Sequence, residues 1–216
     1  MLIKKGAEAS IFLEDWQGQK VIMKHRLPKK YRLPQIDERI RSYRTIRESQ
    51  LLHCAKEAGV STPMIYSVDL VDSNIIMEFI EGIQVKHVLN GYSTGERQHL
   101  SNYIGKLIGN LHLRDIIHGD LTTSNMILNE NGNIVFVDFG LGEISVELES
   151  KGVDLHLMKR AFQSTHFRYA EECFKAVLEG YTKMVGVEMA KKVIGRISEI
   201  ERRGRYVSER KGRVQR

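Results

Sequence analysis

Short runs of β-forming apolar residues, separated by polar turns, dominate the first part of the chain. Ile11-Phe12-Leu13 and Val21-Ile22-Met23 are two such runs, and Gln17-Gly18-Gln19 between them is a turn signal. We interpret the segments from Val60 to Asp69 and from Ile75 to Ile80 as further strands. The pattern therefore predicts a small sheet.

One stretch inside this region has helical spacing. It follows a polar connector bracketed by Pro28 and Pro34, and its apolar residues recur at helical intervals from Ile36 to Ala55. Gly59 stands where such a helix would end, because glycine readily adopts the left-handed conformation that terminates helices. We therefore expect one helix beside the sheet.

After Gly82 the pattern becomes mainly helical. From Glu96 to His112 the apolar residues fall on one side of a helix. Two short strands follow, Met126–Leu128 and Ile134–Phe136, and Asn131-Gly132 between them is a strong hairpin signal. This part of the chain therefore combines a helix with a hairpin.

The remainder of the chain is predicted to be helical. Helices are expected over 154–164, 167–184 and 187–202. The outline is an α+β chain with a strand-rich N-terminal lobe over 1–80, a helical C-terminal lobe over 81–200 and a tail over 201–216.

The formal net charge of +6 is concentrated at the C-terminal end. Residues 201–216 carry seven Lys/Arg and two Glu, a net +5, which leaves +1 for residues 1–200. A second basic segment, residues 24–47, has nine Lys/Arg and two acidic residues. Because neutralised phosphates release counterions, such segments favour RNA as a partner.

Composition narrows the class of protein further. Apolar residues make up 42% and charged residues 28%, which is typical of globular chains. No run approaches the roughly 18 apolar residues of a membrane span, and no apolar segment follows the first lysines, so we expect neither a membrane anchor nor a signal peptide. Cys54 and Cys173 are too few for a disulfide framework or a zinc ribbon, and we expect two thiols in the cytoplasm.

The residues with candidate chemistry lie around the predicted hairpin. Asp120 and Asn125 flank a polar turn before it, and Asp138 ends its second strand. Because a hairpin brings the ends of its strands together, we expect Asn125 and Asp138 to lie side by side, where their oxygen atoms suit Mg²⁺. Asp120 is a further carboxylate that could accept a proton from a hydroxyl group or orient a water.

These segments resemble the protein-kinase signature H-x-D-L-x-x-x-N followed by D-F-G. The resemblance implies a protein-kinase-like bilobal fold that uses ATP and Mg²⁺. Lys24 is similar to the strand lysine that holds the α- and β-phosphates, and Glu48 to the glutamate that pairs with it. Lys20 is the alternative to Lys24, and Glu38 and Glu57 are the alternatives to Glu48.

The same resemblance assigns the site residues. Catalytic roles fall to Asp120, Lys24 and Glu48. Nucleotide contacts are expected from a phosphate-covering loop (Gly6, Ala7, Glu8, Ala9 and Ser10), from Lys24, from a hinge (Met77, Glu78 and Ile80), and from Asn125 and Asp138, which are also the expected metal ligands. The loop departs from G-x-G-x-x-G because only Gly6 is present, although small side chains still let backbone N–H groups approach phosphate.

Three departures from the kinase pattern narrow the family. The catalytic loop has H-G-D in place of H-R-D, the segment after Asp138 is short and lacks A-P-E, and the helical lobe is small and ends in a basic tail. With His118–Asn125 (H-G-D-L-T-T-S-N), Gly6–Ala9 and Val153-Asp154-Leu155, they resemble the small atypical kinase/ATPase subunit of the KEOPS complex, the p-fifty-three-related protein kinase family, in its archaeal form.

This resemblance implies an ATP-dependent serine/threonine kinase/ATPase that supports threonylcarbamoyladenosine formation at tRNA position 37. Its implied partners are a metalloprotein transferase on the helical lobe, a small regulatory subunit on the N-terminal lobe and tRNA on the basic tail. Asp154 would hold the catalytic loop. The alternatives are a RIO-type kinase, an aminoglycoside-type phosphotransferase, and a nucleotide-binding scaffold without catalysis that tethers RNA.

Overall fold

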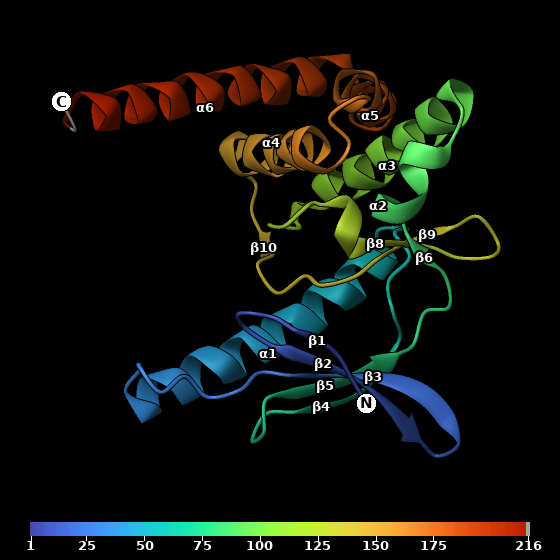
Figure 1. Ribbon diagram of the computed structural model, residues 1–216, viewed down its shortest axis with the longest axis vertical. Coiled ribbons are helices and arrows are strands. Elements are labelled where there is room, and N and C mark those ends of the chain that lie inside the picture. The colour runs from blue at the N-terminus through green and yellow to red at the C-terminus, as the bar shows by residue number, and fades with distance from the viewer. Residues whose placement is uncertain (215–216) are drawn as a thin grey trace. The chain divides into compact units, whose positions relative to one another are not determined.

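The structure is a computed structural model that describes the backbone of residues 1–214 and the side chains of residues 1–203. The chain forms two compact units (Figure 1). Unit 1 comprises Met1–Ile83 and Met126–Gly142, and unit 2 comprises Gln84–Asn125 and the chain from Glu143 onward. The hairpin after Asn125 is therefore grouped with the N-terminal residues, whereas the sequence interpretation placed it in the second lobe.

Unit 1 contains an antiparallel five-stranded sheet in the order β1-β2-β3-β5-β4. Its strands are β1 (Leu2–Lys5), β2 (Ser10–Trp16), β3 (Gln19–His25), β4 (Ile65–Asp69) and β5 (Asn74–Glu78). Gln17 and Gly18 connect β2 to β3, both with positive φ (55° and 81°), which matches the twist of the flanking strands. The predicted turn is therefore confirmed.

The helix of unit 1, α1, spans Pro34–Glu57. Pro34 occupies its first turn, where a missing N–H costs nothing. Gly59 follows the end of the helix with φ 79°, and its N–H donates to Lys56 O while the N–H of Val60 donates to Ala55 O. This pair of bonds satisfies the last carbonyl groups of the helix, so the predicted termination at Gly59 is confirmed.

A smaller sheet belongs to unit 1 except for one residue, Gln84. It has the order β6-β8-β9, with β6 at Ile83–Gln84, β8 at Met126–Leu128 and β9 at Ile134–Phe136. The predicted hairpin is confirmed, because β8 and β9 pair antiparallel. The N–H of Phe136 donates to Ser61 O, which ties the hairpin to the connection after α1.

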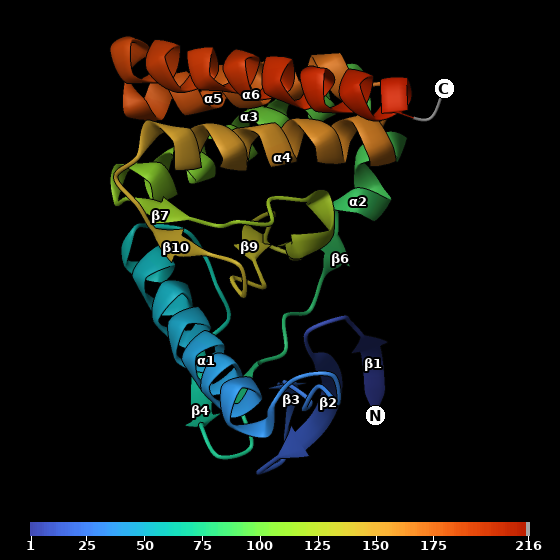
Figure 2. The same cartoon turned by 90° about the vertical axis from the view of Figure 1, so that its left-hand side faces the viewer.

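Unit 2 is mainly helical. In chain order it contains α2 (Val85–Val88), the short 3-10 helix η1 (Leu89–Gly91), α3 (Thr94–Leu113), β7 (Ile116–Ile117), the 3-10 helix η2 (Thr123–Asn125), β10 (Glu143–Ile144), α4 (Leu148–Thr165), α5 (Ala170–Val185) and α6 (Val187–Val214). The helices α3, α4, α5 and α6 form a layered bundle (Figure 2). Its fully buried side chains include Ile104, Ile108, Leu155, Phe162, Val177 and Tyr181.

Glycines permit the closest helix contact of this bundle, between α3 and α5. A Cβ atom on Gly105 would lie 2.0 Å from Val177 O, and one on Gly180 would lie 1.9 Å from Asn102 O. No side chain fits at such distances, so the backbones touch directly. The start of α3 is fixed by Ser93 and Glu96, which cap each other reciprocally.

Several predicted element boundaries were wrong. The helix expected over 187–202 continues as α6 to Val214, into the segment that the sequence interpretation separated as a tail. The strand expected from Val60 begins only at Ile65, because Pro63 has no N–H to donate and Thr62 bonds Leu52 O instead. The helix expected from residue 154 begins at Leu148. Its first five residues, 148–152, contain a single apolar residue, Leu148, and end in Gly152, so they lack the apolar repeat that marks a helix. Packing of Gly152 against α6 stabilises them. Among the described residues, no helix is long and apolar enough to cross a membrane.

Candidate active site

Lys24 lies at the centre of a buried charge cluster in unit 1. Its Nζ donates to Glu48 Oε1 at 2.6 Å and to Asp138 Oδ1 at 2.5 Å. Strand β3 directs Lys24 to the same face as Met77 of β5, because Met77 lies opposite Ile22, two residues before Lys24. The predicted Lys24–Glu48 pair is confirmed, whereas Lys20 is exposed.

Electrostatics keep Lys24 charged. Burial alone would lower the pKa of Lys24, but the neighbouring carboxylates of Glu48 and Asp138 outweigh it and raise that pKa above its ordinary value. A permanent cation at this position can neutralise phosphate oxygens at any physiological pH.

Arg26 extends this cluster. Its Nη2 donates to Glu48 Oε2 at 2.6 Å, so Glu48 is held by a cation on each oxygen. Glu48 is only 1% exposed and Arg26 only 3%. The four charged side chains Lys24, Arg26, Glu48 and Asp138 sum to zero, which is what burial of this many charges requires.

Asp138 follows β9 in a left-handed conformation, with φ 66°. This conformation is uncommon outside glycine, although aspartate tolerates it better than most residues. It presents Oδ1 to Lys24 and also accepts the N–H of Gly140 at 3.3 Å. A Cβ on Gly140 would lie 3.1 Å from both Asp138 Oδ1 and Arg26 Nη2. Gly140 thus allows its loop to lie against the charge cluster.

The phosphate-covering loop predicted from the sequence connects β1 to β2. Gly6 N–H donates to Ala9 O, while Gly6, Ala7 and Glu8 are exposed and Ser10 is buried. Glu8 bonds Arg44 at 2.6 Å and lies 3.7 Å from Arg32, and Lys29 donates to Ala7 O. The loop is therefore tied to α1 and the segment before it. Its role in phosphate binding stays a prediction.

The predicted hinge residues lie at the end of β5. Met77 is buried, and the Glu78 N–H donates to Met64 O while its carboxylate accepts the Met64 N–H. Glu78 and Ile80 border a pocket of about 370 Å³. Its other lining residues are Lys56, Gly59, Val60, Ser61, Thr62, Asn129 and Val135. Adenine binding by this segment stays a prediction.

The catalytic-loop residues belong to unit 2. Asn125 Nδ2 donates to Asp120 Oδ2 at 2.9 Å and to Asp120 O at 3.0 Å. Because the amide nitrogen is used in this way, the amide oxygen of Asn125 is the atom left to face a cation. Asp138 belongs to unit 1, so the expectation that Asn125 and Asp138 lie side by side stays a prediction.

Asp154 fastens this loop from α4. Its Oδ2 accepts the N–H of His118 at 2.8 Å, and its Oδ1 accepts the N–H of Gly119 at 2.9 Å. His112 lies 3.3 Å from the same carboxylate and contacts the hydroxyl group of Tyr181 through its other ring nitrogen. Asp154 is fully buried. The predicted holding role of Asp154 is confirmed.

A second anchor of the loop was missed from the sequence. His166 Nε2 lies 2.9 Å from Thr123 Oγ1, and His166 Nδ1 lies 2.7 Å from Asn90 Oδ1. Burial lowers the pKa of His166. A neutral imidazole satisfies both contacts by donating to the Asn90 oxygen and accepting from the Thr123 hydroxyl group.

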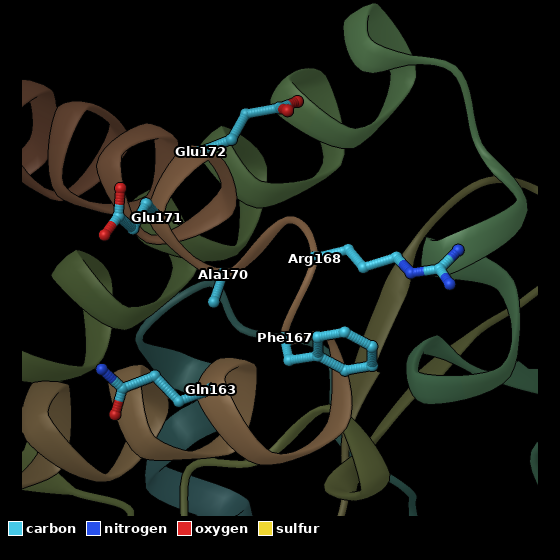
Figure 3. Close-up of a pocket in the computed structure, with 6 residues that line it drawn as sticks. All are labelled: Gln163, Phe167, Arg168, Ala170, Glu171 and Glu172. Carbon is cyan, nitrogen blue, oxygen red and sulfur yellow. The ribbon is translucent and has the colours of Figure 1, made fainter.

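A pocket of about 450 Å³ adjoins this anchor at the α4–α5 connection (Figure 3). Gln163 of α4, Phe167 and Arg168 of the connection, and Ala170, Glu171 and Glu172 of α5 line it. Phe167 is 71% exposed, and the Arg168 guanidinium group lies 5.7 Å from its ring. The pocket lies beside residues that contact the catalytic loop but holds none of the predicted site residues.

The candidate ligands fit magnesium. A carboxylate and an amide oxygen are hard donors, and Mg²⁺ in phosphate sites typically takes one or two side chains while water and phosphate supply the rest. Within the part of the chain that the structure describes, no group of three or more His, Cys, Asp or Glu side chains could hold a metal.

Arg26 was the other residue missed, although the sequence contains a signal for it. Arg26 directly follows β3, and the alternation of faces along a strand, continued one residue past His25, places it on the side of Lys24. His166 and Asn90 offered no such signal, because 76 residues separate them.

Comparisons with known proteins cover almost the whole chain. Residues 19–151 match the RIO domain family. The chain is 46% identical over 211 residues to the KEOPS complex subunit Bud32 of Pyrococcus abyssi, which covers 95% of this chain and 96% of that protein. It is 41% identical to the EKC/KEOPS complex subunit bud32 of Dictyostelium discoideum, which covers 95% of this chain and 82% of the relative.

A longer relative matches as well. The probable bifunctional tRNA threonylcarbamoyladenosine biosynthesis protein of Methanothermobacter thermautotrophicus is 45% identical over 205 residues, and the chain spans only 36% of its length. The RIO match confirms the predicted α+β, kinase-like fold. The sequence analysis treated a RIO-type kinase and a KEOPS subunit as alternatives, whereas the chain both matches the RIO domain and is similar to relatives named as KEOPS subunits.

Proposed function

The chain belongs to the Bud32 family of RIO-domain kinases, and on this basis we propose that it is an ATP-dependent phosphotransferase or ATPase of a KEOPS complex. Its cellular role would be to support threonylcarbamoyladenosine formation on tRNA in the cytoplasm, as the name of the bifunctional relative suggests. The RIO domain supports the class of reaction. The serine/threonine kinase activity, ATP, Mg²⁺ and the named partners are parts of the proposal.

The observation that carries the proposal is the buried cluster in which Lys24 bridges Glu48 and Asp138. Lys24 would neutralise the α- and β-phosphates, and Glu48 would hold its ammonium group in place. Asp138 bonds the same ammonium group that the phosphates would contact. Phosphate oxygens can replace Asp138 as the partner of Lys24, which releases the Asp138 carboxylate for its own role.

Asp138 and Asn125 would hold Mg²⁺, which would supply charge neutralisation on the transferred phosphoryl group. Asn125 is prepared for this role, because its amide nitrogen bonds Asp120 and leaves its oxygen for the cation. Asp120 would orient water or a serine hydroxyl group for in-line attack. The hydrogen bond from Asn125 and the anchoring of the loop by Asp154 fix Asp120, so positioning and charge provide the acceleration.

The proposed partners follow from the family. Two relatives are named as subunits of a KEOPS complex, which supports the same assembly for this chain. We place the transferase on the helical lobe, the regulatory subunit on the N-terminal lobe, and tRNA on the basic tail 201–216. The side chains of this tail beyond Arg203 lie outside the described residues.

The test follows labelled γ-phosphate from Mg-ATP and separates free phosphate from phosphoprotein. Wild type, Asp138→Ala and the control Asp72→Ala, which changes an exposed aspartate of unit 1, are each assayed alone and with the transferase and tRNA. We expect wild type and the control to release phosphate in the presence of the partners, and Asp138→Ala to lose at least 100-fold (about 2.7 kcal/mol of barrier). Nucleotide binding without any movement of label would favour the scaffold alternative instead.

A further inference from the structure

Arg26 is a buried cation for which the proposed reaction has assigned no role. Its side chain is 4% exposed, and Nη2 donates to Glu48 Oε2 at 2.6 Å. Its Nε and Nη1 atoms are buried and have no hydrogen-bond partner. Burying an arginine with two unused donors is unfavourable, so a position that keeps one invites a functional explanation.

Glu48 does not need Arg26 for neutrality while Lys24 is bound to it. Lys24 already supplies one positive charge at 2.6 Å from Oε1, and Arg26 adds a second at Oε2. The two cations exceed the single negative charge of Glu48, and the carboxylate of Asp138, which also bonds Lys24, balances the extra positive charge. The balance therefore depends on Lys24 serving two carboxylates at once.

Nucleotide binding would end that arrangement. If phosphate oxygens replace Asp138 as the second partner of Lys24, Lys24 still bonds Glu48 but shares its charge with a more strongly anionic group than Asp138. A buried carboxylate without a full partner is strongly unfavourable, and moving its helix toward solvent would relieve the cost. Arg26 is the group that can prevent this, because its contact with Glu48 uses neither Lys24 nor Asp138.

The main chain of Arg26 is also tied to α1. Arg41 Nη1 donates to Arg26 O at 3.3 Å and to Ser73 Oγ at 3.1 Å, while Arg41 Nε donates to Asp37 at 2.8 Å. Arg26 N–H donates to Ser73 O. Helix α1 is thus attached to Arg26 at two points that lie two turns apart, Arg41 and Glu48.

Arg26 also supports the loop that carries Asp138. A Cβ on Gly140 would lie 3.1 Å from Arg26 Nη2 and 3.6 Å from Glu48 Oε2. The guanidinium group of Arg26 therefore bonds Glu48 of α1 and lies close to Gly140, two residues after Asp138. Its two unbonded nitrogen atoms, Nε and Nη1, provide N–H donors for either element when Lys24 changes partners.

We propose that Arg26 is a positioning residue that keeps Glu48 and α1 in place when nucleotide draws Lys24 and Asp138 away from each other. The inference rests on the proposed function, because it requires Lys24 to bind phosphate. It distinguishes this chain from a site that relies on a single lysine–glutamate pair: here the helix stays fixed in both the free and the nucleotide-bound state.

The test compares Arg26→Gln, Arg26→Lys and the control Arg39→Gln, which changes an exposed arginine of α1. Amide hydrogen exchange over residues 41–52 is measured with and without Mg-ATP, and phosphate release is measured with the partners present. We expect Arg26→Gln to exchange at least tenfold faster only when Mg-ATP is bound, and kcat to fall at least tenfold while KM changes less than threefold. Arg26→Lys, which keeps the charge, should recover most of both.

Two results would overturn the inference. Exchange in Arg26→Gln equal to that of Arg39→Gln in both states would show that Arg26 does not hold α1. Equal acceleration with and without nucleotide would show a merely structural role. Failure of the wild type to release or transfer phosphate would instead contradict the proposed function, and the exchange measurement would still decide the role of Arg26.

Discussion

Single buried charges set much of the behaviour of this molecule. Lys24, Glu48 and Asp154 are each almost fully buried, and each bonds a group that is distant in the chain. The identities of these residues were predictable, because chemistry restricts which side chains can serve. Their second partners, such as Arg26 for Glu48 and His112 for Asp154, were not predicted, because they depend on where other elements pack.

At Asp154 we expect a large loss of stability on truncation. Asp154→Ala removes the acceptor of two backbone N–H groups, those of His118 and Gly119, and an unsatisfied buried donor costs about 1–3 kcal/mol. Urea denaturation should therefore show a free energy of unfolding lower by roughly 3 kcal/mol. Asp154→Asn, which keeps one oxygen, should lose less. The control Asp72→Ala should change by no more than about 0.5 kcal/mol, and equal losses in the two alanine variants would contradict the anchoring role.

His166 should make stability depend on pH. Burial lowers its pKa in the folded chain below the ordinary value of 6.5, so the unfolded chain binds more protons in mild acid. The stabilising contribution is therefore present above pH 6.5 and is lost as pH falls below it. Burial lowers the pKa of His156 as well, so each histidine contributes part of the slope.

Denaturation of wild type, His166→Gln and the exposed control His53→Gln at several pH values checks this expectation. His166→Gln should reduce the slope of unfolding free energy against pH, on the acid side of pH 6.5, by up to about 1.4 kcal/mol per pH unit. The slope of His53→Gln should match wild type. An unchanged slope in His166→Gln would show that this imidazole is not held neutral.

At the scale of elements, tertiary contacts decide where helices begin and how closely they approach. Helix α4 starts six residues before the sequence predicted. Near its start Lys151 forms an ion pair with Asp115, and a Cβ atom on Gly152 would lie 2.7 Å from Arg196 Cβ. Hydrophobic periodicity cannot detect a turn that is held by an ion pair and a glycine contact. It did locate α1, α3 and the β8–β9 hairpin, where the apolar repeat is continuous.

The α3–α5 contact leads to a prediction at this scale. Gly105→Ala places a methyl group 2.0 Å from Val177 O, so the helices must separate, and we expect a loss of about 3 kcal/mol or more in unfolding free energy. The matched control is Gly195→Ala in α6, where nothing lies within 4 Å and alanine should stabilise the helix by up to about 1 kcal/mol. Thermal or urea unfolding of the two variants measures the difference in stability. Similar stabilities of the two variants would contradict a backbone contact between α3 and α5.

At the scale of the whole molecule, charge is distributed unevenly. The net charge is +6, of which residues 201–216 carry +5. A nearly neutral body can fold without self-repulsion, while the basic end remains available to a polyanion. This division follows from composition alone, and it concerns association more than folding.

Truncation after Arg203 tests the role of the tail. It removes five basic residues and Glu209, so binding to tRNA should weaken, and the slope of log affinity against log salt should decrease in magnitude by up to about 4. The control replaces Lys4 and Lys20 of unit 1 with glutamine. A truncated chain with the wild-type salt slope would remove the tail from the RNA-binding surface.

The sequence by itself determined the class of this protein and its principal chemical groups. The catalytic-loop and D-F-G residues could be proposed directly from the sequence, because phosphate and metal chemistry accepts few residue types and Lys24, Asp120, Asn125 and Asp138 are of those types. The distribution of charge likewise predicted a basic C-terminal segment, and the pattern of apolar residues predicted an α+β chain with two lobes.

Only the tertiary structure decided which groups share a partner. Glu48 between Lys24 and Arg26, Thr123 beside His166, and the backbone contact at Gly105 all join residues that are far apart in the chain. Such contacts depend on the distances between packed elements, which local patterns of apolar and polar residues do not encode. For that reason the residues of the candidate site could be predicted from the sequence, while the contacts that hold them in position could not.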